Sequence, residues 1–149
     1  MTKWDKYIKS ITSAVERTDY LYEKWSKLHD ENSYVTKIMY MIYVTGLVRQ
    51  KDIVENYGMP KQTVNTVITG LLKNGYINLT PDKTDKRSKI IELTDSGLEY
   101  ANSIIKPLLD CEKKVLAEMG EERVKLMIET MNQYANLFEK YMNKANSKN

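Results

Sequence analysis

Apolar residues recur every three or four positions along several stretches of the chain, which is the spacing of one face of an α-helix. The first stretch spans residues 4–28 and predicts a long amphipathic helix with a wide apolar face. Three shorter helices are predicted over residues 34–45, 51–57 and 60–74. Gly46 and Gly58 are placed to end the first two of these, and Pro60 to begin the third, where its missing N–H costs nothing.

The pattern changes after Gly75, because the residues that follow favour strands. Residues 76–80 and 89–93 are rich in β-prone side chains and predict two paired strands, joined by a polar connector over 81–88. Beyond them, Thr94 is placed to cap a helix that contains Pro107, which predicts a kink or a break. Gly120 ends that helix, and a last amphipathic helix is predicted to run to about residue 145.

This order of elements predicts a mainly α-helical fold with a small β-hairpin wing. We expect residues 1–149 to form one domain, with a winged helix-turn-helix module over about 34–94 and dimerisation helices over about 1–31 and 95–145. Pairing with a second copy is one interpretation of the wide apolar faces of the first and last helices. Burial in the core of a single chain is the other.

The composition is that of a folded protein with one unevenly charged segment. Hydrophobic residues make up 42% of the chain, no apolar run approaches the roughly 20 residues of a membrane span, and the start lacks the pattern of a signal peptide. With a single cysteine, these features predict a cytoplasmic protein without disulfides. The net charge is only +3, but residues 60–91 contain six basic and two acidic side chains. This concentration is typical of a surface that meets phosphates, and also of an ordinary solvated loop.

The helix predicted over 60–74 has a polar face with the chemistry to read DNA bases. Gln62 and Asn65 can each make two hydrogen bonds to adenine, threonine side chains can contact phosphates or thymine methyls, and Lys61 can neutralise a phosphate. A polar face by itself more often has no ligand, but a basic hairpin follows this one directly. The side chains expected to contact DNA from this helix are Lys61, Gln62, Thr63, Asn65, Thr66 and Thr69.

The connector of the hairpin predicts a second DNA contact. Lys83, Lys86 and Arg87 lie where the tip of a wing over about 81–88 can reach a minor groove. Asp85 is an unexpected acid in such a loop. Its presence is explained if it accepts hydrogen bonds from loop N–H groups or orients Arg87.

Three short motifs resemble the MarR family of transcriptional regulators. The wing signature of that family is similar to residues 85–88 (DKRS), its strand-to-helix signature to 93–97 (LTDSG), and its link from recognition helix to wing to 72–77 (LKNGYI). The resemblance covers nearly the whole chain. It implies a homodimer that binds a pseudo-palindromic operator in double-stranded DNA, and a small-molecule effector or an oxidant that relieves DNA binding. We expect such a regulator to act as a repressor. A winged helix that has lost DNA binding and serves as a protein-interaction module is the alternative.

The remaining residues of chemical interest do not point to catalysis. No nucleophile has a nearby base, so we expect no enzyme activity, cofactor or metal site. His29 is placed to cap the first helix, and Cys111 is interpreted as a packing or exposed residue. Tyr34, Tyr40 and Tyr43 could line a cleft for a small aromatic effector, although packing explains them equally well.

Overall fold

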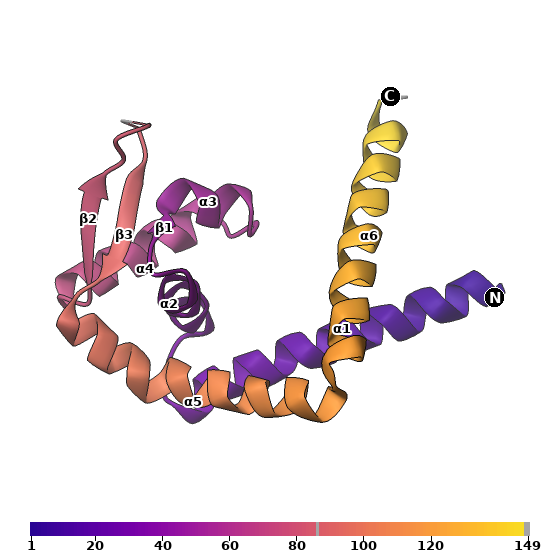
Figure 1. Cartoon of the computed structure of the whole chain (residues 1–149). Coiled ribbons are helices and arrows are strands. Elements are labelled where there is room, and N and C mark those ends of the chain that lie inside the picture. The colour runs from indigo at the N-terminus through magenta and orange to yellow at the C-terminus, as the bar shows by residue number, and fades with distance from the viewer. Residues whose placement is uncertain (86, 148–149) are drawn as a thin grey trace. The chain divides into compact units, whose positions relative to one another are not determined.

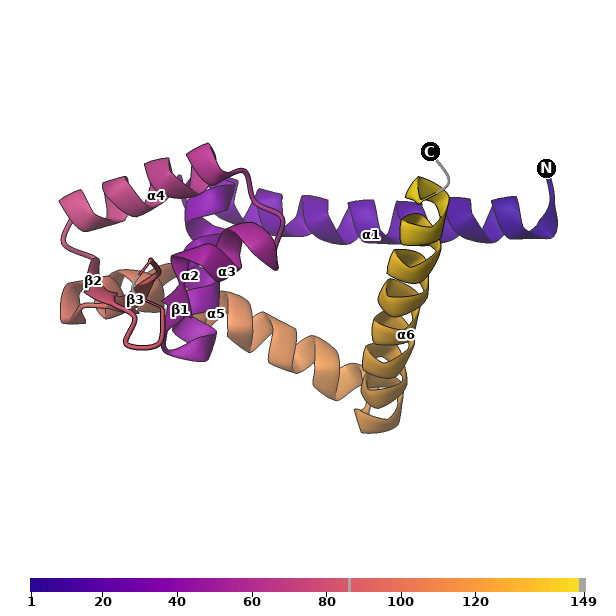
Figure 2. The ribbon, with the colours of Figure 1, turned by 90° about the horizontal axis from the view of Figure 1, so that it is seen from above.

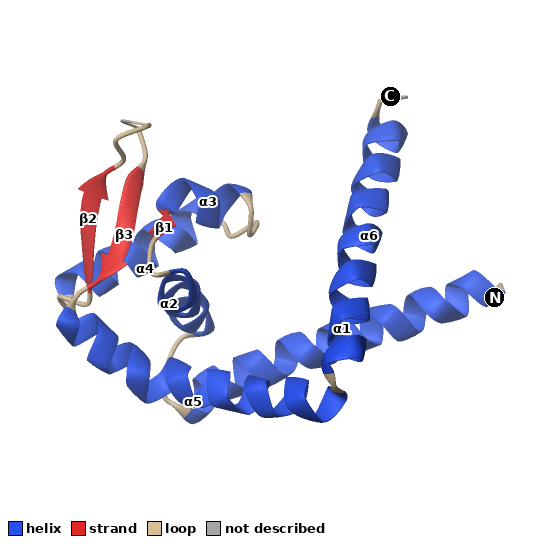
Figure 3. Ribbon diagram, viewed as in Figure 1, coloured by secondary structure: helices blue, strands red, loops and turns tan. Residues whose placement is uncertain are grey.

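The computed structural model describes residues 1–85 and 87–147, which form two compact units. The first unit is Met1–Leu108 and the second is Leu109–Asn149. The first contains four helices, three strands and the beginning of a fifth helix (Figure 1). Its strands gather in one small sheet, whereas the described residues of the second unit form helices joined at Gly120 and contain no strand (Figure 3). Within the described residues, no helix is long and apolar enough to cross a membrane.

The helices of the first unit begin close to the predicted positions because their caps are local. They are α1 (Lys3–Leu28), α2 (Ser33–Thr45), α3 (Gln50–Glu55) and α4 (Lys61–Lys73). Thr2 and Asp5 form a reciprocal capping box at the start of α1, and the Asn32 side chain accepts the N–H of Tyr34 at the start of α2. His29 is the C-cap of α1. Only α3 differs by more than one residue at an end, since it stops at Glu55 and not at 57.

The sheet has three strands, one more than the sequence predicted. Strands β1 (Val48–Arg49), β2 (Ile77–Pro81) and β3 (Lys89–Leu93) lie in the order β1-β3-β2, and both pairings are antiparallel. The pairing of β1 places Val48 opposite Ile91. With two residues, β1 is too short to produce a periodic pattern, so only its tertiary partner defines it. The hairpin and α4 lie next to each other at one end of this unit in both views (Figures 1 and 2).

One hydrophobic core holds the helix-turn-helix, the sheet and the first part of α5 (Asp95–Met119) together. The start of α5 is hydrogen-bonded to the residues just before β2. Thr94 donates its N–H to the Tyr76 carbonyl at 3.1 Å and its hydroxyl to the Gly75 carbonyl at 2.6 Å. The Thr94 hydroxyl also accepts the N–H of Gly97, as expected of a helix cap. The fully buried side chains of the core include Ile38, Met39, Ile42, Ile53, Val64, Ile91 and Ile105.

The helix α5 continues through Pro107, so the break that the sequence allowed there is absent. Proline leaves the carbonyl of Ser103, four residues earlier, without its helical partner. Both residues are exposed, so water can satisfy that carbonyl and the helix can continue.

The second unit contains the end of α5 and all of α6 (Glu121–Asn146). No described residue of α6 is buried, although the helix has a strong apolar stripe. A large apolar surface of this kind normally marks an interface. The exposed apolar side chains of α6 include Leu126, Ile128, Met131, Phe138 and Met142.

Candidate nucleic-acid interface

Helices α3 and α4 form a helix-turn-helix whose second helix has one buried and one exposed face. The chain turns at Gly58, which has a positive φ of 63°, and the buried Met59 anchors the turn. Pro60 precedes the first residue of α4. The apolar face of α4 is buried through Val64, Val67, Ile68 and Leu71. Its polar face is therefore fixed toward solvent by the core beneath it.

The predicted base-reading side chains of α4 are not equally accessible. Lys61, Gln62, Thr66 and Thr69 are exposed, whereas Thr63 and Asn65 are half-buried. The Thr66 hydroxyl donates to the Gln62 carbonyl at 2.9 Å within the helix. The Asn65 carbonyl oxygen accepts a hydrogen bond from the side-chain amide of Gln50 at 2.7 Å. Sequence reasoning missed this contact, because it joins residues on two different helices.

The base of the wing is fixed by a buried carboxylate that sequence reasoning missed. Asp82 is 3% exposed and accepts hydrogen bonds from the N–H and the hydroxyl of Thr84 at 2.8 and 2.7 Å. Its other oxygen forms an ion pair with the Arg49 guanidinium at 2.5 Å. The hydrogen bonds from Thr84, with the positive charge of Arg49, lower the pKa of Asp82 to about 2. Asp82 is therefore ionised at neutral pH and joins the wing to β1.

The tip of the wing is tied by Asp85. Its side chain accepts the N–H of Arg87 at 3.0 Å, and its backbone carbonyl accepts the N–H of Ser88 at 2.8 Å. The second carboxylate oxygen lies 3.9 Å from the Lys51 ammonium of α3. Lys83 and Arg87 are exposed, whereas Lys86 lies outside the described residues. That Asp85 orients Arg87 for DNA stays a prediction.

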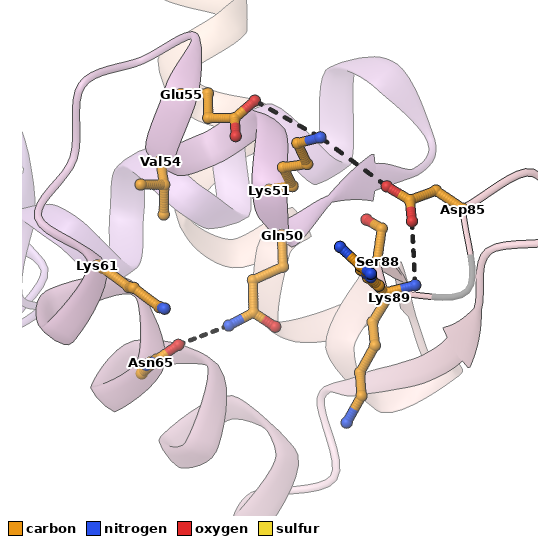
Figure 4. Close-up of a pocket in the computed structure, with 10 residues that line it drawn as sticks. Gln50, Lys51, Val54, Glu55, Lys61, Asn65, Asp85, Ser88 and Lys89 are labelled. Atoms are coloured by element: carbon orange, nitrogen blue, oxygen red, sulfur yellow. Dashed lines mark hydrogen bonds and ion pairs between the residues drawn. The ribbon is translucent and has the colours of Figure 1, made fainter.

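A groove of about 670 Å³ separates the helix-turn-helix from the wing. Figure 4 shows its walls, with α3 and the start of α4 on one side and the wing on the other. Four basic side chains line it against two acidic ones. Five of its polar lining residues were not among the predicted contacts: Gln50, Lys51, Glu55, Ser88 and Lys89. The charged lining residues are Lys51, Glu55, Lys61, Asp85, Arg87 and Lys89.

A second, more apolar hollow of about 310 Å³ lies between α1, α2 and α5 within the first unit. Tyr22, Tyr40 and Tyr57 line it, and Lys37 contributes a positive charge. Of the three tyrosines considered for an effector cleft, only Tyr40 lies here. The Tyr43 hydroxyl instead donates to Asn102 at 2.8 Å. Tyr34 lines a different hollow, beside α4.

The other candidate residues do not gather into a chemical site. Cys111 is exposed on α5. The His29 ring nitrogen Nδ1 lies 2.9 Å from the Trp25 carbonyl, at the end of α1. Among residues 1–85 and 87–147, no group of three or more histidine, cysteine, aspartate or glutamate side chains is arranged to hold a metal ion.

Comparison with known proteins agrees with this architecture. The sequence model of the MarR family matches residues 33–89. A solved MarR family regulator from Neisseria meningitidis is 26% identical, with a TM-score of 0.79, and the match covers 97% of this chain and 99% of that one. MarR from Staphylococcus aureus, solved with salicylate and kanamycin, is 20% identical, with a TM-score of 0.67 over 91% and 92% of the two chains.

A curated relative matches a smaller part of the chain. The uncharacterized HTH-type transcriptional regulator YwaE from Bacillus subtilis is 26% identical over 90 residues, which are 60% of this chain. The match spans about half, 53%, of the length of that relative.

Proposed function

We propose that this chain is a MarR-like regulator of transcription that binds double-stranded DNA, because the sequence model of that family matches residues 33–89 and the fold is similar to that of a solved MarR family regulator. Helix α4 enters the major groove and the wing reaches the adjacent minor groove. The observation that carries the proposal is the basic groove between α3, α4 and the wing, in which Lys51, Lys61, Arg87 and Lys89 converge from separate elements. Convergent cations on a rigid scaffold match the repeating phosphates of a duplex.

The protein acts as a homodimer on a pseudo-palindromic operator in this proposal, and its two units function together as one MarR-like domain. The support is the exposed apolar surface of α1 in the first unit and that of α6 in the second, since pairing with a second copy can bury surfaces of this kind. On α1 this surface includes Trp4, Ile8, Ile11 and Val15. A two-fold dimer places two α4 helices about one turn of DNA apart, roughly 34–36 Å. Light scattering coupled to size exclusion measures the mass that this arrangement requires.

The regulator represses transcription, and a small aromatic acid relieves this repression by releasing the protein from DNA. The hollow between α1, α2 and α5 supports this part of the proposal, because it offers aromatic walls and the ammonium of Lys37 to a planar carboxylate. Titration of salicylate into the complex with operator DNA tests it. Release of the DNA by salicylate, weakened by Lys37→Ala, is the expected result. If no member of a panel of aromatic acids releases the DNA, the effector part of the proposal is wrong.

Selection of binding sites from random duplexes tests DNA recognition directly. We expect a palindromic motif, and an affinity that falls steeply with added salt because several cations displace counterions from phosphates. Arg87→Ala should weaken binding by about 1–3 kcal/mol if Arg87 contacts base edges. Arg17→Ala is the matched control, since Arg17 is an exposed arginine on α1 outside the groove.

Two results would contradict the proposal. One is a selection at low salt that enriches no motif. The other is an Arg87→Ala, Lys89→Ala double variant that binds duplexes as tightly as the unchanged protein. That second result would favour the alternative in which the winged helix recognises a protein.

A further inference from the structure

Arg49 connects the helix-turn-helix to the wing. It is the second residue of β1 and directly precedes α3, so its backbone belongs to the start of the helix-turn-helix. Its guanidinium reaches the wing, where Nε lies 2.5 Å from the Asp82 carboxylate and Nη2 donates to the Thr84 hydroxyl at 3.3 Å. One side chain therefore holds two residues of the wing against the strand that leads into α3.

The wing beyond Asp82 is closed by its own hydrogen bonds. At its base, the Asp82 N–H donates to the Ser88 carbonyl at 3.1 Å, and the Asp82 carboxylate accepts the N–H and the hydroxyl of Thr84. At its tip, the Asp85 carboxylate accepts the N–H of Arg87 at 3.0 Å. Because these contacts hold the loop together internally, a displacement of Asp82 also displaces Arg87.

The ion pair with Arg49 favours one position of the wing relative to α3. Asp82 is 3% exposed, and a buried carboxylate that loses its charged partner is strongly destabilised. The hydrogen bonds from Thr84 move with the wing, since both of these residues belong to it. Arg49 is the partner that lies outside the wing, and it therefore decides where Asp82 is stable.

We propose that Arg49 is a positioning residue for DNA recognition, which fixes the wing relative to α3 and α4 so that Arg87 reaches the minor groove while α4 occupies the major groove. This inference rests on the proposed DNA-binding function. A wing that could move would have to be ordered on binding, and that cost would reduce the affinity that Arg87 contributes. Arg49 acts through the wing and not through a contact of its own with DNA.

A double-mutant cycle between positions 49 and 87 tests the proposal, since a positioning residue has no effect once the group that it positions is gone. Fluorescence anisotropy measures the affinity of the full chain for a labelled duplex that carries the motif enriched by binding-site selection, at one salt concentration. We expect Arg49→Ala to weaken binding about fivefold when Arg87 is present, and by less than about twofold in the Arg87→Ala background.

A second cycle with Lys61 is the matched control. Lys61 lines the same groove but is the first residue of α4, so its position does not depend on the wing. Arg49→Ala should therefore weaken binding by the same factor in the Lys61→Ala background as in the unchanged protein. Circular dichroism establishes that each variant is folded.

Arg49→Lys replaces Arg49→Ala in the cycles if the alanine variant does not fold. Lysine keeps a positive charge opposite Asp82 but lacks the planar fork that also reaches Thr84. We expect a smaller loss of affinity for this variant, of about twofold to threefold, and again only when Arg87 is present.

The outcomes separate this inference from the proposed function. If the unchanged protein binds no duplex, DNA recognition and the role of Arg49 both fail. If it binds the selected duplex but the substitution at position 49 weakens binding equally with and without Arg87, then Arg49 contributes through general stability or its own phosphate contact, and the inference alone is overturned. An affinity that the substitution leaves unchanged overturns it as well.

Discussion

Gly97 is the position at which one added methyl group should harm the fold most clearly. It is buried in the first turn of α5, directly against the backbone of Tyr76 at the start of the hairpin. A Cβ atom at this position would lie 1.8 Å from the Tyr76 carbonyl oxygen and 2.7 Å from its carbon. Real Cβ contacts stay above 3.0 Å, so in Gly97→Ala the two segments must move apart by about 1.2 Å.

The magnitude follows from what that movement disturbs. Overpacking of a tight interior contact costs about 1–3 kcal/mol. The same movement stretches the hydrogen bond from the Thr94 N–H to the Tyr76 carbonyl and the one from the Thr94 hydroxyl to the Gly75 carbonyl, each contributing about 1 kcal/mol. We therefore expect Gly97→Ala to lower the free energy of unfolding by about 3 kcal/mol, which corresponds to a fall of about 10 °C in Tm for a chain of this length.

Urea unfolding followed by circular dichroism measures this difference. Gly70→Ala is the matched control, because Gly70 is also helical but has no atom within 4 Å of an added Cβ. There the substitution should raise stability by about 0.4–1 kcal/mol, since alanine restricts the unfolded chain and favours helix. A Gly97→Ala protein as stable as Gly70→Ala would refute the reasoning, because the close approach to Tyr76 would then be without consequence.

Two further predictions concern the polar contacts that hold the wing and its junction. Asp82 has a pKa of about 2 in the fold, below its usual 3.8, so its ionised form stabilises the protein fully above about pH 4 and this contribution disappears as the pH falls toward 2. The difference in unfolding free energy between the unchanged protein and Asp82→Asn should therefore shrink between pH 5 and 2, and a constant difference would exclude this linkage. Thr94→Val keeps the shape of the side chain but removes its hydrogen bonds to Gly75 and Gly97, and urea titration should show a loss of about 1–2 kcal/mol. An unchanged midpoint would contradict the role of Thr94 as a cap.

The local part of the fold is predictable from the sequence. The capping residues Thr94 and Asn32 and the turn glycine Gly58 act on their near neighbours, so the pattern of residues alone places most helix ends within one position. The two strands of the hairpin can also be predicted from the sequence, since the alternation of side chains and their β-propensity are local properties. The same reasoning identified the polar face of α4, because the apolar spacing fixes which side chains are buried.

Contacts between residues far apart in the chain were decided by tertiary structure. The strand β1 exists only through its pairing with β3, and Asp82 is buried only because Arg49 and Thr84 surround it. Gln50 and Asn65 form a hydrogen bond only because α3 and α4 pack together. In a linear sequence each of these polar residues looks like an ordinary exposed side chain. Through the spacing of apolar residues, the sequence determines which faces are buried. The packed core then decides which polar groups form hydrogen bonds, because a hydrogen bond tolerates a change of only a few tenths of an ångström in the distance between donor and acceptor.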